Sequence, residues 1–324
     1  MTLLLSESDV RELLTMPEAV AAVEEVMRRQ AAGLAIVHPR HRLELPDKGF
    51  LHYMAGADVS AGLVGMKLYT SVRGALRFLV PLYRSTTGEL IALIEADYLG
   101  LMRTGAASGV ATRYMARADA RTVGIIGTGH QAAGQVEGVA AVRKLAKVRV
   151  YGRDAERRAR FAAEMSESIG VSVEPARSAE EAVRGADIVV TATTANRAVV
   201  EGAWLAPGTH INAVGANFPQ KRELDDAVVA RASRIAVDFI EQAKMEAGDL
   251  IQAFAGDAAR WNSVHELAEI ISNKIPGREG AEEITLFKSS GIAIWDVAVG
   301  ARVVELAVAR GIGKKIPLWE GQED

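Results

Sequence analysis

The sequence contains no cysteine among its 324 residues. This absence excludes disulfide bonds, thiolate nucleophiles and metals held by cysteine. Histidine is also sparse, and its six copies stand at positions 38, 41, 52, 130, 210 and 265. Their spacing matches neither H-E-x-x-H nor a comparable ligand pattern, so we predict no metal site.

The chain also lacks an excess of charge of one sign and any long apolar run. Its 38 basic and 41 acidic residues give a net charge of -3, which provides no electrostatic footprint for nucleic acid. No apolar stretch reaches the length of a membrane span, and the N-terminus shows neither a charged leader region nor a cleavage site. We therefore expect a cytoplasmic protein, long enough for two domains, with no nucleic-acid or membrane partner.

A glycine-rich motif begins late in the chain. The apolar run Val123–Ile126 opens into the pattern G-x-G-x-x-A at Gly127–Ala132. In a dinucleotide-binding fold the first glycine permits a tight turn, and the second lets the backbone approach a pyrophosphate. The segment from Gln131 to Leu145 predicts a helix whose N-terminal amides would hold that anion. The motif therefore predicts a dinucleotide site preceded by a separate region of the chain.

Short apolar runs recur after this motif, with helix-like segments between several of them. The strand candidates are Val148–Tyr151, Val171–Val173, Ile188–Thr191, His210–Ala213 and Ile235–Val237. The helix candidates are Asp154–Ser168 and a segment that opens with the capping-box pattern Ser178–Glu181. Together with the first strand they make six β-units, which is typical of a doubly wound parallel sheet. We predict an α/β Rossmann domain over residues 119–290.

The choice of cofactor depends on the end of the second strand. An acidic residue there would bind the ribose of NAD, whereas an arginine would bind the phosphate of NADP. The chain reads Gly152-Arg153-Asp154, so a glycine occupies the usual carboxylate position and an arginine follows it. This favours NADP(H), while Asp154 leaves NAD(H) possible. We interpret Arg157 and Arg158 as solvated surface charges.

The region before the glycine motif combines a helix with several strand-like segments. Thr15–Glu18 has capping-box form and opens an amphipathic helix that continues to about Gln30. The strand-like segments cover residues 38–45, 50–55, 64–71, 79–84 and 90–95. Thr86–Glu89 predicts a hairpin turn, and the small-residue helix Ala106–Ala116 leads to the Rossmann domain. We expect this region to supply the substrate site.

Several motifs together resemble the ornithine cyclodeaminase and mu-crystallin family. They are Met66-Lys67, Thr87-Gly88, Leu101–Ala107, the glycine motif, Asn212–Asn217 with Pro219 and Arg222–Asp225, and Phe287–Gly291. No single motif is decisive, but they follow the family's order and spacing over nearly the whole chain. The family has a reductase branch, which includes ketimine reductases, pyrroline-2-carboxylate reductases and archaeal-type alanine dehydrogenase.

The resemblance implies a fold. The Rossmann domain would be inserted into a second α/β domain that binds the substrate and forms a homodimer. That second domain would consist of residues 1–118 and 291–324. The segment Ile292–Arg310 agrees with this, because Trp295, Val299 and Val303 recur near helical spacing. We expect this helix to pack back on the N-terminal region.

The resemblance also implies the substrate-binding residues. Family chemistry passes through the imine of an α-amino or α-keto acid, so the site needs a cation for a carboxylate, and a guanidinium binds one in bidentate form. Arg103 matches the family's substrate-binding arginine, and Lys67 matches its site lysine. Arg42 is the better match for an upstream arginine, with Arg40 as the fallback. Lys67 could bind the carboxylate or donate a proton.

A further set of residues is predicted to bind the cofactor. These residues are Gly127, Thr128, Gly129, His130, Gln131, Arg153, Thr191, Thr193, Val214, Gly215, Ser290 and Gly291.

Asn217 departs from the cyclodeaminases, which have an aspartate there that acts on the substrate amine. An amide performs no acid-base catalysis at neutral pH, although it still forms hydrogen bonds. His52 stands where the cyclodeaminases have another acidic site residue, and it is either a proton donor or a structural hydrogen-bonding group. We therefore place Lys67, Asn217 and His52 in the catalytic site of a reductase. It would use NAD(P)H to reduce a cyclic imine carboxylate, or a small α-keto acid with an amine.

Two other functions stay open at this point. One is an ornithine-type cyclodeaminase with recycled NAD, and the other is a non-catalytic, NADPH-binding protein like mu-crystallin. Arg73 and Arg77 have no match in the family. They are either exposed or contact a second carboxylate, in which case the substrate would be dicarboxylic.

Overall fold

The computed structural model describes residues 1–46 and 49–318, and it divides into two compact units. Unit 1 comprises Met1–Arg103 and the segment from Ile292 onward, and unit 2 comprises Thr104–Gly291. The boundary expected from the sequence lay at residue 118, whereas helix α3 (Asp97–Met115) crosses the division in the structure. The segment Asp97–Ala107, which carries Arg103, is therefore helical throughout.

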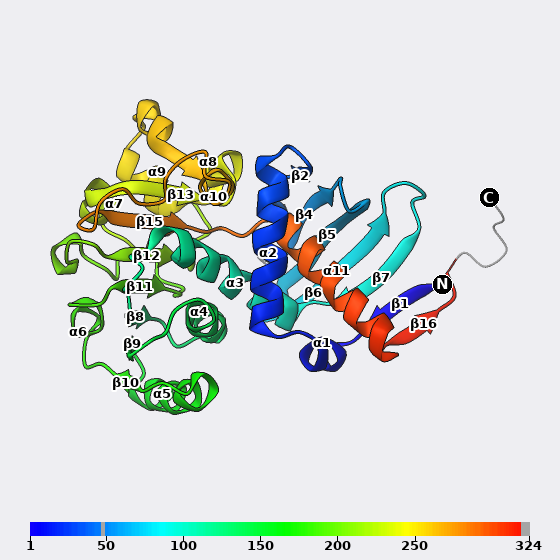
Figure 1. Ribbon diagram of the computed structural model, residues 1–324, viewed down its shortest axis with the longest axis horizontal. Coiled ribbons are helices and arrows are strands. Elements are labelled where there is room, and N and C mark those ends of the chain that lie inside the picture. The colour runs from blue at the N-terminus through cyan, green and yellow to red at the C-terminus, as the bar shows by residue number, and fades with distance from the viewer. Residues whose placement is uncertain (47–48, 319–324) are drawn as a thin grey trace. The chain divides into compact units, whose positions relative to one another are not determined.

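Unit 1 is built on a mixed sheet in the order β16-β1-β7-β6-β5-β4-β2, with β3 paired to β4 (Figure 1). Its strands are β1 (Thr2–Leu5), β2 (Ala35–Val37), β3 (His41–Glu44), β4 (Phe50–Asp58), β5 (Leu63–Val72), β6 (Ala75–Arg84), β7 (Leu90–Glu95) and β16 (Lys314–Ile316). Only the β1–β7 pair is parallel among the described strands. The predicted turn at Thr86–Glu89 is confirmed, since it joins antiparallel β6 and β7 and contains Gly88 at φ 74°.

Besides the first part of α3, the described residues of unit 1 form the helices α1 (Glu7–Leu13), α2 (Met16–Ala31) and α11 (Ala293–Arg310). Thr15 caps α2 as predicted, because its side chain accepts from the Glu18 amide. Helix α11 packs against α2 and against β4 and β5, so the C-terminal helix does return to the N-terminal region (Figure 1). Gly65 makes room for this contact, since a Cβ there would lie 3.1 Å from Val297 Cγ2.

Unit 2 contains a parallel sheet in the order β10-β9-β8-β11-β12-β15-β13-β14. Its strands are β8 (Thr122–Ile126), β9 (Lys147–Tyr151), β10 (Val173–Pro175), β11 (Ile188–Thr191), β12 (His210–Ala213), β13 (Ala232–Val237), β14 (Val264–Glu266) and β15 (Ile284–Lys288). When the strands of unit 2 are numbered along the chain, the first five lie across the sheet in the order 3-2-1-4-5. The Rossmann prediction is therefore correct. The six-strand expectation missed β14 and β15, and β10 begins at Val173 rather than Val171.

Short helices connect these strands. They are α4 (His130–Ala140), α5 (Ala155–Ile169), α6 (Ala179–Val183), α7 (Asp226–Arg231), α8 (Ile240–Glu246), α9 (Gly248–Phe254) and α10 (Leu267–Ile271), with 3-10 turns η1 (Gly202–Trp204) and η2 (Ala258–Ser263). Helix α4 is shorter than the segment predicted to end at Leu145. Side chains of Asp154 and Ser178 cap α5 and α6, as their sequence patterns indicated.

Helices α3 and α4 meet through glycine. A Cβ on Gly105 would overlap the carbonyl of Gly134, and a Cβ on Gly138 would overlap that of Gly105. Gly109 lies one turn further along α3, and a Cβ there would strike the carbonyl of Gly138. The two backbones therefore touch directly, which explains why this part of the sequence is rich in small residues.

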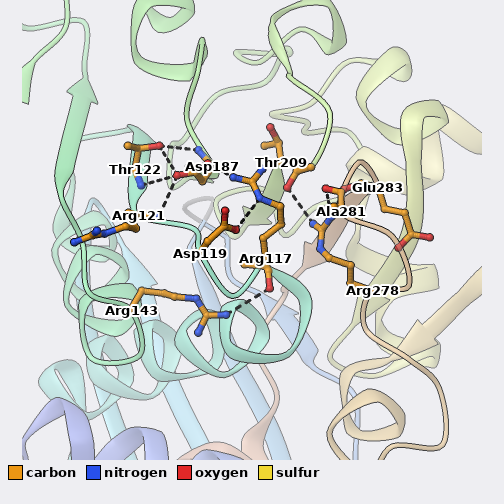
Figure 2. Close-up of polar contacts among 12 residues, drawn as sticks. Arg117, Asp119, Arg121, Thr122, Arg143, Asp187, Thr209, Arg278, Ala281 and Glu283 are labelled. Atoms are coloured by element: carbon orange, nitrogen blue, oxygen red, sulfur yellow. Dashed lines mark hydrogen bonds and ion pairs between the residues drawn. The ribbon is translucent and has the colours of Figure 1, made fainter.

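Arginines join the C-terminus of α3 to the amino ends of the parallel strands (Figure 2). Arg143 Nη2 donates to the Thr112 carbonyl at 2.8 Å, and Arg278 Nε donates to the Met115 carbonyl at 2.9 Å. Such contacts satisfy carbonyls that have no partner within the helix. Nearby, Asp187 accepts hydrogen bonds from Thr122 Oγ1 at 2.7 Å and from Arg117. This cluster is structural, since Rossmann ligands bind at the opposite, carboxyl ends of the strands.

Asn212, one of the motif residues, is fully buried in the same unit. It donates to Thr112 Oγ1 at 2.9 Å, and its Oδ1 lies 3.2 Å from His210 Nε2. The other ring nitrogen of His210 lies 2.9 Å from Thr285 Oγ1. Burial above all lowers the pKa of His210 to about 3, so this histidine is neutral at physiological pH. Asn212 therefore stabilises the fold.

Candidate functional site

Two cationic side chains of unit 1 meet at a buried carboxylate. Asp296 Oδ1 accepts a hydrogen bond from Lys67 Nζ at 3.0 Å and another from Arg103 Nε at 3.2 Å. Lys67 lies on β5, Arg103 on α3 and Asp296 on α11, and all three are buried. The structure thus brings two predicted site residues together around an aspartate that no motif had indicated. Its only signal in the sequence is a lone charge within the apolar stretch Ala293–Gly300.

The strand alternation and one glycine place Lys67 in this cluster. Gly65, Lys67 and Tyr69 alternate along β5, so they share the face of the sheet on which α11 packs. Helix α3 passes next to the ammonium group, because a Cβ on Gly100 would lie 2.7 Å from Lys67 Nζ. Glycine at this position therefore provides the space that Lys67 Nζ occupies.

The cluster holds two cations against one carboxylate. Burial, followed by repulsion from Arg103, lowers the pKa of Lys67 to about 8, while Asp296 acts in the opposite direction. Lys67 therefore remains mostly protonated at neutral pH. Because the positive charge is only partly balanced, this buried site favours an anion such as a carboxylate.

Aromatic rings line the same face of the sheet. Lys67 Nζ lies 5.1 Å from the centre of the Phe78 ring, and Phe78 contacts Tyr69 at a centroid distance of 4.9 Å. On the other side, the Arg103 guanidinium lies 5.8 Å from the centre of the Trp295 ring. These rings favour the cationic forms of both side chains.

His52 lies on this face but is poorly suited to donate a proton. Its Nε2 is 3.1 Å from Ser71 Oγ, and its ring stacks on Tyr69 at 4.2 Å. Burial, then the charges of Arg42 and Arg40, lower the pKa of His52 to about 4. The imidazole is neutral at physiological pH, so these contacts support a hydrogen-bonding role.

The two upstream arginines occupy different places. Arg40 is buried, with its Nη2 at 3.9 Å from Met54 Sδ, and Met54 is the cross-strand neighbour of Lys67. Arg42 is half-buried on β3 and pairs across the sheet with His52. The resemblance favoured Arg42, whereas the burial and neighbours of Arg40 place the fallback residue nearer to the cation cluster.

Arg77 points away from this cluster. Phe78 faces Lys67, so its neighbour Arg77 lies on the opposite face of β6, where it is exposed and donates to the Leu76 carbonyl. Arg73 is exposed in the hairpin turn between β5 and β6, at φ 50°. Arg77 therefore gives no support to a second carboxylate contact.

The glycine motif has the form expected for a dinucleotide site. Gly127 has φ 121°, and a Cβ there would overlap the Ala192 carbonyl at the end of β11. Gly129 is the N-cap of α4, and no side chain of the described chain caps this helix. His130 and Gln131 form its first turn. Strands β8 and β11 are adjacent at the point where the strand order reverses, and such a switch point is where Rossmann ligands bind. The residues fit the pyrophosphate of a dinucleotide.

At the first position after β9, any side chain would have to displace the Thr128 side chain. A Cβ on Gly152 would lie 2.7 Å from Thr128 Oγ1. Arg153 is exposed at this end, and Arg157 Nε donates to the Thr128 carbonyl at 2.9 Å. Asp154 accepts from the Arg157 amide at 2.8 Å and caps α5. Arg157 is exposed, as expected, and also contacts the glycine loop. Arg158 differs from the expectation, because it is half-buried and donates to the Gly152 carbonyl.

A buried glutamate organises the loops after β11 and β12. Glu223 accepts from Thr191 Oγ1 at 2.9 Å, from the amide and hydroxyl of Thr193, both at 2.7 Å, and from the Gly215 amide at 2.7 Å. Burial above all raises its pKa. The sequence reading placed Glu223 in a family motif without assigning it a role. Three predicted cofactor residues are therefore held by one carboxylate.

Lys288 and Asp249 extend this network to Ala216, the residue before Asn217. Lys288 Nζ donates to the Ala216 carbonyl at 2.6 Å and lies 3.1 Å from Asp249 Oδ2. Asp249 Oδ1 accepts from the amides of Glu223 and Leu224 at 2.6 and 2.9 Å. The backbone next to Asn217 is therefore fixed, and Val214 belongs to the same loop.

The last two predicted cofactor residues bond to an acidic side chain. The amides of Ser290 and Gly291 both donate to Asp238 Oδ2 at 2.6 Å. Asp238 itself lies one residue after β13 and is buried. These contacts hold the turn that follows β15.

Residues 1–46 and 49–318 hold no group of three acidic or histidine side chains that could bind a metal. Within the same ranges, every helix is too short or too polar to cross a bilayer.

Comparisons with known proteins identify the family and the fold. Residues 1–311 match the model of the ornithine cyclodeaminase/mu-crystallin family, and the chain belongs to this family. It is 37% identical to a Δ1-pyrroline-2-carboxylate reductase of Bacillus cereus, over 97% of this chain and 99% of the relative. The resemblance drawn from the motifs is therefore confirmed.

Two solved structures have nearly the same fold. The Thermococcus litoralis Δ1-pyrroline-2-carboxylate reductase in complex with NADH and L-proline superposes with a TM-score of 0.93, at 36% identity, and the match covers 97% of this chain and 100% of that one. An archaeal alanine dehydrogenase dimer with bound NAD gives a TM-score of 0.92 at 36% identity, covering 98% and 99%.

Proposed function

We propose that this protein is an NAD(P)H-dependent reductase of imines of small α-keto acids. The observation that carries the proposal is the buried pair Lys67 and Arg103, which share one carboxylate and leave positive charge for a substrate carboxylate. Reduction of a cyclic imine carboxylate, or reductive amination of an α-keto acid, would use this arrangement. Relatives that reduce pyrroline-2-carboxylate or dehydrogenate alanine support the same class of reaction.

Each site residue has a distinct role in this reaction. Arg103 binds the substrate carboxylate through nitrogens that Asp296 does not engage, with Arg40 or Arg42 as a second contact. Lys67, which is mostly protonated at neutral pH, donates a proton to the imine nitrogen. When bound, the reduced nicotinamide supplies a hydride to the imine carbon, so the C=N bond becomes a CH–NH bond. Asn217 positions the substrate by hydrogen bonds.

A screen of cofactor oxidation tests this function. NADH and NADPH would each be mixed with pyruvate plus ammonia or methylamine, and with five- and six-membered cyclic imine carboxylates. We expect one equivalent of cofactor to be consumed per product. Release of ammonia from ornithine without net cofactor oxidation would identify a cyclodeaminase, and tight NADPH binding without turnover would identify a carrier.

The role of Arg103 has its own test. Arg103→Ala should lower kcat/KM on the best substrate by about a hundredfold, because losing one partner of a buried charged contact costs about 2 to 5 kcal/mol. Arg84→Ala removes an exposed arginine of the same unit and serves as the control. Full activity in Arg103→Ala would contradict the site assignment.

We also propose that NADP(H) is the preferred cofactor and that NAD(H) is accepted. Gly152 occupies the position at which a carboxylate would bind the ribose of NAD. Arg153 lies at the end of β9, and Arg157 contacts the glycine loop. Solved relatives that hold NADH or NAD make the second cofactor plausible. Arg153→Ala and Arg157→Ala should each raise KM for NADPH and leave KM for NADH nearly unchanged. Equal effects on both cofactors would contradict the preference.

A homodimer is proposed through the sheet face of unit 1 opposite α11. His41, Tyr53, Leu68 and Leu79 form a cross-strand row there, and Tyr53 and Leu79 are 38% and 37% exposed. Exposed apolar rows of this kind mark protein interfaces, and the solved archaeal relative is a dimer. Leu79→Arg should yield monomers in light scattering. Leu76→Arg, at a leucine on the other face of β6 that is 48% exposed, should not.

A further inference from the structure

Asp296 makes contacts that differ from those of an ordinary buried ion pair. A single oxygen, Oδ1, accepts from both Lys67 and Arg103. Oδ2 is also buried, and among the described residues no hydrogen-bonding group reaches it. The separation of the two cationic nitrogens is therefore set by two hydrogen bonds to one atom.

This sharing fixes the orientation of the Arg103 guanidinium. Its Nε edge is engaged by Asp296 at 3.2 Å, and a guanidinium is planar and rigid. The terminal Nη1–Nη2 edge must then point away from Oδ1. That edge is the one that binds a carboxylate end-on through two hydrogen bonds. Asp296 thus decides which edge of Arg103 a substrate can use.

The same carboxylate balances charge on Lys67. The charged groups that act on Lys67 come from three elements besides its own strand: Arg103 on α3, Asp296 on α11, and Arg40 before β3. Arg103 and Arg40 disfavour the ammonium form, and Asp296 is the group that favours it. Without this carboxylate the ammonium would face two guanidinium groups in a buried place.

We propose that Asp296 is a positioning residue for the reaction, holding the Lys67 ammonium and turning Arg103 toward the substrate carboxylate. The proposal rests on the proposed function, since it assigns Lys67 and Arg103 their substrate roles. In this proposed role Asp296 touches neither substrate nor cofactor, and it acts through Lys67 and Arg103.

The pH profile of Asp296→Asn tests the proposal. The amide has nearly the same shape but no charge, so Lys67 should lose its proton at lower pH. We expect the alkaline limb of kcat/KM to move down by about one to three pH units, the usual effect of an opposite charge at this distance. Activity at pH 8 should fall about tenfold or more, with a smaller loss at pH 6. KM for the carboxylate substrate should rise at both pH values.

Asp58→Asn is the matched control. Asp58 is another buried carboxylate of unit 1, paired with Arg29 at 2.6 Å on the far end of β4 and apart from Lys67 and Arg103. Both variants should lose stability, but only Asp296→Asn should move the alkaline limb and KM. An unshifted limb in Asp296→Asn, or an equal shift in Asp58→Asn, overturns the proposal.

A thermal double-mutant cycle needs no substrate. In the Lys67→Met/Arg103→Met background, Asp296 becomes a buried carboxylate without its two partners. Adding Asp296→Asn there should raise Tm, although the same change lowers Tm in the wild type. A fall in Tm in both backgrounds overturns the positioning role. Because this cycle uses no substrate, it still tests the coupling of Asp296 to Lys67 and Arg103 if the reductase activity is not found.

Discussion

Each unit buries a cluster of charged side chains, and the two clusters differ in composition. In unit 1, Lys67 and Arg103 share Asp296, so two cations meet one carboxylate. In unit 2, Lys288 pairs with Asp249 next to Glu223, so one cation meets two carboxylates. The first cluster retains positive charge that can bind an anion. The second binds its own chain, because Glu223 and Asp249 accept from loop amides and hydroxyls.

This difference separates two uses of a buried charge. Glu223 accepts four hydrogen bonds, which offset part of its desolvation and hold the loops after β11 and β12. From the described residues Asp296 accepts two hydrogen bonds, both on one oxygen, and its partners keep donors for a ligand. A cluster saturated by its own chain stabilises the fold. A cluster with unused donors can bind a substrate.

Lysine-to-methionine changes test the difference between the two clusters, and we expect them to have the largest effects. Lys288→Met leaves the buried carboxylate of Asp249 with its two amide hydrogen bonds but without a cation, and it should lower the free energy of unfolding by about 3 to 5 kcal/mol. Lys67→Met leaves Asp296 bonded to Arg103, so it should cost less stability while kcat falls by about a hundredfold or more. Urea unfolding and steady-state kinetics on both variants measure the contrast. Equal stability losses would remove the distinction between the clusters.

Two glycines of helix α3 allow a structural role to be distinguished from a role in the site. Gly105→Ala drives a Cβ into the Gly134 backbone and should lower stability by about 1 to 3 kcal/mol. Gly100→Ala only displaces Lys67 Nζ, so stability should hold or rise by about 0.5 to 1 kcal/mol while kcat/KM falls about tenfold. Thermal unfolding and kinetics distinguish them. Normal activity in Gly100→Ala would show that the position of Lys67 is unimportant.

The pH dependence of the wild type should show activity and stability moving in opposite directions. Activity should decline above pH about 8, where folded Lys67 loses its proton. Between that pH and the ordinary lysine value of 10.5, the unfolded chain binds more protons than the folded one, so the contribution of Lys67 to stability rises with pH. Rate profiles and urea titrations would record both trends. Lys67→Met should abolish the rise in stability.

The smallest effect concerns the two buried histidines. His52 in unit 1 and His210 in unit 2 have pKa values lowered, mainly by burial, to about 4 and about 3 from 6.5. Their stabilising contribution is complete above pH 6.5 and is lost as the pH falls toward those values, because the unfolded chain then binds more protons. Thermal unfolding between pH 7 and pH 4 should show a shallower decline for His210→Asn. An unchanged slope would mean that His210 titrates normally.

Much of the fold could be predicted from local pattern. The turn at Gly127, the caps at Thr15, Asp154 and Ser178, and the return of the C-terminal helix all follow from nearby residues. Strand β15 was not predicted, although it lies between β12 and β13. Its pairing depends on strands distant in the sequence, and a short apolar run does not reveal such a partner.

The candidate site was predictable only in part. Lys67 and Arg103 stand in recognisable motifs. The importance of Asp296 depends on its contacts with them, and they precede it in the sequence by 229 and 193 positions, respectively. Arg40 and Arg42 share the same alternation, and burial is what distinguishes them. Arg157 is similar, because its sequence context does not reveal a hydrogen bond to Thr128, which lies 29 positions earlier.

The sequence by itself determined the fold class, the place of the dinucleotide motif and the family, because these depend on periodicity, caps and ordered motifs. Only the tertiary structure decided which charges are buried together and how they are shared. Burial makes charges interact strongly, and it arises when β5, α3 and α11 bring Lys67, Arg103 and Asp296 to one point. A linear pattern names charged residues, whereas three-dimensional packing sets their electrostatics.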